Sequence, residues 1–170
     1  MLDCKGEQNL MRAPELRDAI YNPVWTSEVL HHFLSGTTIS GPPKIKTEML
    51  CLYPSIFDDN IMEQLSRANR ASSFYSFFET KRNIDSKLLL IDINKKIMAF
   101  REIACEALIY LSNQVQLRIG EFIEIFDVVN YANINDASMQ KQCKAAFYWG
   151  HVLAKEDYTT LFIKLGIIEL

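Results

Sequence analysis

The stretches Tyr21-Asn22-Pro23-Val24-Trp25 and Leu30-His31-His32-Phe33-Leu34 predict the first convincing helix of the chain. Asn22 is a favoured N-cap residue, and Pro23 suits the first helical position, where its missing N–H is no loss. The apolar residues of the two stretches fall three, four or eight positions apart, so they share one broad face. The pattern predicts an amphipathic helix over about 23–35, with Gly36 as a left-handed terminator.

A second apolar segment, Met49 to Phe57, lies beyond a loop that contains Gly41-Pro42-Pro43. Pro54 disfavours a central strand here, because proline cannot donate a hydrogen bond to a β ladder. A strand at a sheet edge stays open. Asn60 and Glu63 then have the spacing of a capping box, which predicts a short helix. Ser72 or Ser73 is expected to cap a further short helix that carries Phe74 to Phe78.

The second half of the chain predicts a long helix, a hairpin and two more helices. The long helix, over about 92–113, is apolar around much of its girth, with Met98, Cys105 and Ile109 beside its main stripe, so it is expected to be the central core helix. Residues 115–126 show the period-2 alternation of a small hairpin. Helices over about 137–155 and 158–165 follow, the last ended by Gly166.

The expected fold is therefore a mainly α, compact helical domain with a small β-hairpin. The succession of core helix, hairpin and helix is also compatible with a winged-helix topology. The chain has 170 residues, 49% of them hydrophobic and 23% charged, which is typical of one globular domain. We expect a flexible segment at 1–13 and a single domain over 14–170.

Charge and hydropathy restrict the function. The net charge of −3 argues against a strong independent nucleic-acid binder. The N-terminus does not resemble a signal peptide, and no apolar run approaches the length of a membrane span. We therefore expect no contact with a membrane and a reducing, cytoplasmic location.

No catalytic, cofactor-binding or metal site is expected from the motifs. The four cysteines have no CxxC or zinc spacing, and Cys105 and Cys143 lie in apolar patterns typical of small core residues. His31 and His32 are adjacent, so on a helix they point about 100° apart and form partly exposed surface or an interface rather than a chelate. A Walker A sequence and a GxGxxG motif are both absent.

One helix face has a specific geometry. Five residues spaced three and four positions apart form one line along the helix 137–155: Lys141, Lys144, Tyr148, His151 and Lys155. We call this line the α-helical basic row. The expected inward face comprises Met139, Cys143, Ala146, Phe147, Gly150 and Leu153. The basic row is either a solvated helix face or a docking strip for an acidic partner or a phosphate backbone. Gly150 suggests the close approach of another helix, since glycine inside a helix otherwise costs about 1 kcal/mol.

Motifs spread over residues 19–169 resemble a known family. An Asn-Pro pair, Asn22-Pro23, opens the first helix, and an apolar segment with an internal proline, Pro54, follows. Trp149-Gly150 and the closing pair Leu165-Gly166 complete the pattern. The arrangement resembles the middle component of three-component ABC-ATPase defence systems, whose best-known branch is the Lamassu anti-phage system.

The resemblance implies a helical segment around Pro54 and a non-catalytic accessory subunit. Such a subunit bridges an SMC-like ABC ATPase and an effector, commonly a nuclease, and meets DNA through the complex. Aromatic residues expected to form a partner patch are Trp25, Phe33, Tyr75, Phe77 and Phe78. The alternatives are a winged-helix DNA-binding regulator, which would bind duplex DNA alone with a steep salt dependence, and an unrecognised enzyme.

Overall fold

A computed structural model describes residues 21–42, 44–79 and 84–167. Its elements in chain order are α2 (Pro23–Thr37), η1 (Thr38–Ser40), η2 (Thr47–Phe57), α3 (Asp59–Ser66), η3 (Tyr75–Glu79), α4 (Ile84–Ser112), β1 (Leu117–Ile119), β2 (Ile123–Ile125), η4 (Tyr131–Asn133), α5 (Ala137–Leu153) and α6 (Tyr158–Leu165). The fold is mainly helical with an antiparallel hairpin, as predicted. The flexible segment predicted at 1–13 lies outside the described residues.

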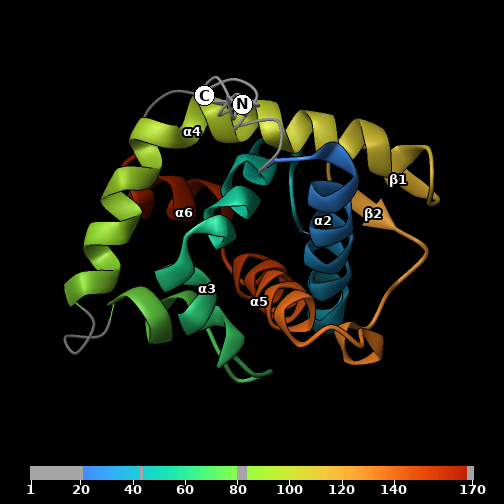
Figure 1. Cartoon of the computed structure of the whole chain (residues 1–170). Coiled ribbons are helices and arrows are strands. Elements are labelled where there is room, and N and C mark those ends of the chain that lie inside the picture. The colour runs from blue at the N-terminus through green and yellow to red at the C-terminus, as the bar shows by residue number, and fades with distance from the viewer. Residues whose placement is uncertain (1–20, 43, 80–83, 168–170) are drawn as a thin grey trace, which may run out of the picture.

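Helices α2 and α5 cross at the centre of the molecule, and α4 arches over one side of them (Figure 1). A β-carbon added at Gly150 would overlap the backbone carbonyl oxygen of Phe33, and one added at Gly36 would overlap that of Phe147. The predicted close approach at Gly150 is confirmed. The prediction for Gly36 is wrong, because α2 continues to Thr37 and Gly36 lies inside it, where the backbone of α5 leaves no room for a side chain.

Most helix ends follow the local signals of the sequence. The Asn22 side chain accepts a hydrogen bond from the backbone N–H of Val24 at 2.9 Å, and Pro23 is the first residue of α2. At the other end of the chain, Asp157 caps α6, and Gly166 ends it with a φ of 66°. A left-handed residue of this kind is favourable for glycine because it has no β-carbon.

The start of α3 differs from the prediction. Asp58, not Asn60, is the N-cap, and its side chain accepts hydrogen bonds from the backbone N–H groups of Asn60 and Ile61. The helix starts earlier because η2 ends at Phe57 and Asp58 adopts the extended conformation of a cap. Glu63 therefore does not close a capping box and instead pairs with Arg67 and Lys141.

The segment around Pro54 is a 3-10 helix rather than a strand, and its residues from Met49 to Ile56 are buried. It packs against α4 and α5. The indole Nε1 of Trp149 donates a hydrogen bond to the carbonyl oxygen of Leu52 at 3.0 Å, which anchors α5 to η2. A fully buried polar contact of this kind fixes the position of both elements, since breaking it would leave unpaired polar groups inside the protein.

Helix α4 begins at Ile84, earlier than predicted, and leads into the predicted hairpin. The two strands pair Arg118 with Glu124, and the N–H of Ile123 donates to the carbonyl oxygen of Ile45 at 2.9 Å.

Before α4, the aromatic segment forms a π-helical turn over Tyr75–Glu79 instead of an ordinary helix. The predicted aromatic patch is wrong at Phe33 and Phe78, which are buried in the core.

Candidate functional site

The α-helical basic row is not exposed along its whole length, which corrects the prediction. His151 is only 2% exposed, and its Nε2 lies 3.0 Å from the carbonyl oxygen of Arg70, to which it donates. Lys155 donates from Nζ to the same oxygen at 2.9 Å and to the carbonyl oxygen of Ser72 at 2.6 Å. Burial lowers the pKa of His151 and of Lys155. These two side chains therefore hold the segment between α3 and η3 in place.

The other end of the basic row is also partly occupied. Lys141 pairs with Glu63, and the hydrogen bonds from Lys141 and then Arg67 lower the pKa of the Glu63 carboxyl. The hydroxyl groups of Tyr131 and Tyr148 lie 3.3 Å apart. Within the described parts of the chain, Lys144 makes no ion pair. A shallow recess of about 300 Å³ beside this end is lined by Ser66, Tyr131, Ala137, Gln140, Lys141 and Lys144.

The inward face of α5 is largely as predicted, since Cys143, Ala146, Gly150 and Leu153 are buried. Phe147 and Met139 belong to the same predicted face but are only partly buried. The family-motif residues Asn22, Pro23, Pro54, Gly150, Leu165 and Gly166 all have structural positions at caps, crossings or buried turns.

His31 and His32 lie in the interior, which contradicts the expected partly exposed surface. His31 Nε2 lies 2.6 Å from the carbonyl oxygen of Asp127, and His32 Nδ1 lies 3.0 Å from that of Glu28.

In the described residues, no group of three or more histidine, cysteine or acidic side chains is placed to hold a metal ion. The helices that the structure describes include none long and apolar enough to cross a membrane.

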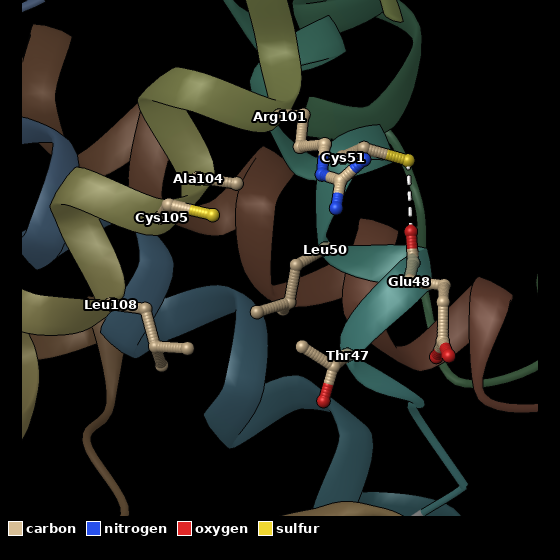
Figure 2. A pocket seen from close by; sticks show the side chains of 8 residues that line it. All are labelled: Thr47, Glu48, Leu50, Cys51, Arg101, Ala104, Cys105 and Leu108. Carbon is tan, nitrogen blue, oxygen red and sulfur yellow. Dashed lines mark hydrogen bonds between the residues drawn. The ribbon is translucent and has the colours of Figure 1, made fainter. Parts of the chain in front are cut away.

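A cavity of about 280 Å³, which no pattern in the sequence predicted, lies between η2 and α4 (Figure 2). Both elements line it with residues from one face each: Thr47, Glu48, Leu50 and Cys51 from η2, and Arg101, Ala104, Cys105 and Leu108 from α4. The lining is predominantly apolar. The spacing of the four α4 residues at three, one and three positions is that of one helix face.

The polar groups of this cavity include the Cys51 thiol and the Arg101 guanidinium. The Cys51 thiol donates to the carbonyl oxygen of Glu48 at 2.9 Å, and burial raises its pKa to about 12. It is therefore a thiol at neutral pH, and the thiolate is the reactive form of cysteine. Arg101 extends from α4 toward η2, whereas the Glu48 side chain points away from α4 (Figure 2). In the part of the chain that the structure describes, Arg101 makes no hydrogen bond or ion pair.

The outer face of α4 continues the cavity onto the surface. Met98 is 63% exposed and Ile109 is 66% exposed. Cys105 is exposed too, which corrects its prediction as a core residue, and it belongs both to this face and to the cavity lining. We call Met98, Cys105 and Ile109, together with the cavity, the α4 docking face. The arrangement suits an apolar group that brings one negative charge to Arg101.

Comparison with known proteins places the chain in a family but supplies no solved relative. No curated protein and no solved structure matches it, so the winged-helix topology stays a prediction. The family model described as ABC-three component (ABC-3C) system Middle Component 3 matches residues 11–169. This range includes nearly all of the fold and the whole α4 docking face. The chain therefore belongs to the Middle Component 3 family of ABC-three component systems.

Proposed function

We propose that this chain is a non-catalytic accessory subunit that links an SMC-like ABC ATPase to an effector of nuclease type. The system would be an anti-phage or anti-plasmid defence complex of the Lamassu type in the cytoplasm. The observation that carries the proposal is the family match over residues 11–169, because a middle component of a three-component system implies two companion components.

The surface of the molecule supports a role in assembly. Exposed apolar side chains next to a cavity are typical of the centre of a protein interface. The α4 docking face has this composition, with Met98 and Ile109 each more than half exposed. The chemistry supports a non-catalytic role as well, since burial raises the pKa values of the Cys51 and Cys143 thiols and so keeps both protonated.

Contact with DNA is proposed to occur through the complex. Two members of the α-helical basic row, His151 and Lys155, bind main-chain carbonyl groups of the chain itself, and Lys141 is paired with Glu63. Few positive charges on this face are thus available to neutralise phosphates. A DNA-binding regulator would need several such charges, because phosphate contacts provide most of its affinity.

Co-expression tests the proposed function. The tagged chain is expressed together with the reading frames adjacent to its gene, and the purified material is analysed by size exclusion and mass spectrometry. We expect a stable complex that contains an ABC ATPase with a coiled coil. Elution of the chain as a lone monomer would contradict the proposal, and tight, salt-dependent binding of duplex DNA by the isolated chain would favour the regulator.

An activity assay tests the absence of catalysis. The isolated chain is expected to show no ATP hydrolysis and no DNA cleavage above the level of a mock purification. Turnover that co-purifies with the chain through several columns, and that disappears after a point substitution in this chain, would show that it is an enzyme.

A further inference from the structure

We propose that the α4 docking face receives an amphipathic helix of the partner ATPase, with an aliphatic side chain in the cavity and a carboxylate against Arg101. The inference rests on the proposed function, since it names the chemistry by which the accessory subunit recognises its partner. The cavity, the charge of Arg101 and the exposed flank of α4 each support it.

The size of the cavity indicates what enters it. Pockets for drug-sized ligands and cofactors usually measure about 300 to 1,000 Å³. At about 280 Å³ the space between η2 and α4 lies just below this range. Its walls include Leu50, Ala104 and Leu108, which offer van der Waals contact but few hydrogen bonds. Aliphatic or methionine side chains of a partner suit the apolar walls of such a space better than a polar cofactor does.

The charge of Arg101 indicates what accompanies the apolar group. The guanidinium extends over the cavity without an ion pair or hydrogen bond among the described residues, whereas the Glu48 side chain points away (Figure 2). Arginine binds a carboxylate with two parallel hydrogen bonds, and such pairs are strongest where neighbouring apolar groups exclude water. The partner is therefore expected to carry Asp or Glu one helical turn from its apolar side chain.

The flank of α4 indicates that the partner segment is a helix. Met98, Cys105 and Ile109 are separated by seven and four residues, so they form a stripe about three turns long on α4. All three are exposed. A stripe of this spacing packs well against a second helix, because side chains spaced three and four apart form ridges that fit the grooves of a partner helix.

Three variants test the inference in the complex purified from co-expression. Arg101→Glu reverses the charge at the cavity, and Cys105→Trp places a large side chain at its edge. Lys96→Glu is the matched control, because it makes the same charge reversal at an exposed position of the same helix. Thermal unfolding of each isolated variant shows that the fold is intact. Affinity for the ATPase is then measured by surface plasmon resonance.

We expect Arg101→Glu and Cys105→Trp each to weaken binding by roughly 30-fold or more, as residues at the centre of an interface do. Lys96→Glu should change binding by less than about threefold. A second measurement uses the exposed thiol: in a Cys4→Ser background, Cys105 should react with N-ethylmaleimide at least about tenfold more slowly in the complex than alone.

The outcomes separate the two proposals. If the wild-type chain binds no ABC ATPase, the proposed function fails. If it binds the ATPase, but both variants bind as the wild type does and Cys105 reacts at the same rate in the complex, the α4 docking face is not the interface while the proposed function stands. Protection of Cys105 by self-association of the isolated chain would also overturn the inference, because the occupant would then be a second copy.

Discussion

The crossing of α2 with α5 and the contact of η2 with α4 are both apolar contacts between helices, but they leave very different amounts of space. At the crossing, Gly36 and Gly150 bring the two backbones together so closely that neither position has room for a β-carbon. Between η2 and α4, side chains hold the elements apart and leave a cavity of about 280 Å³. The comparison shows that apolar composition alone does not indicate whether two helical segments pack without a gap or leave a cavity between them.

The largest expected effect breaks the crossing. Gly150→Ala should destabilise the protein by about 3 kcal/mol, because its β-carbon would overlap a rigid carbonyl oxygen and not a flexible side chain. Gly120→Ala is the matched control, since the nearest atom to its added β-carbon, the carbonyl oxygen of Phe122, lies 3.9 Å away. Urea unfolding measures both variants, and equal stabilities would show that the helices adjust their separation at little cost.

A smaller effect concerns the segment that α5 holds through the α-helical basic row. Lys155→Met keeps the aliphatic stem but removes two hydrogen bonds to main-chain carbonyls, so it should destabilise the protein by about 1–2 kcal/mol. Lys144→Met removes a lysine from the same helix and should cost less than about 0.5 kcal/mol. Chemical denaturation with both variants checks the difference, and a similar small loss in each would show that the hydrogen bonds of Lys155 add little to the stability of the fold.

Acid should lower the free energy of unfolding through the buried histidines. Burial, first among the causes, lowers the pKa values of His32 and His151 from 6.5 and so favours the neutral imidazole in the folded protein. The unfolded chain then binds more protons below about pH 6.5, and stability that is present above this pH is lost as the pH falls.

We expect the free energy of unfolding to decrease as the pH falls below about 6.5, with a slope of at most ~1.4 kcal/mol per pH unit for each histidine. Urea unfolding at several pH values measures the slope. A His32→Asn, His151→Gln variant should show a shallower slope than the wild-type protein. An identical slope in that variant would assign the acid sensitivity to carboxyl groups instead.

The smallest effect on stability is expected at the outer face of α4. Ile109→Ser and Met98→Ser remove exposed apolar side chains and should change the free energy of unfolding by no more than about 0.5 kcal/mol. Ile103→Ser, on the buried side of the same helix, should cost several times more. A large loss of stability in Ile109→Ser would mean that other parts of the chain cover this face. The outer face of α4 would then contribute to the fold as the crossing of α2 with α5 does.

Local signals in the sequence predicted much of the secondary structure. Asn22, Asp157 and Gly166 act at helix ends as their side-chain chemistry and backbone freedom predict, and the alternation before Gly120 predicted the hairpin. Errors arose where two local signals competed. Asp58 and Asn60 are both good N-cap residues, and the end of η2 decided between them. Gly36 looked like a terminator because the sequence cannot show that the backbone of α5 lies against it.

The sequence by itself determined the helical class, most of the helix ends and, through its family, membership in a three-component ABC system. Only the tertiary structure decided which faces remain exposed. His151 was predicted as surface and is buried, while Cys105 was predicted as core and is exposed. The physical reason is that periodicity reports the faces of one helix, whereas exposure depends on which other elements pack against each face. That packing also left a cavity between η2 and α4, which Arg101 lines without an ion pair or hydrogen bond to any residue that the structure describes.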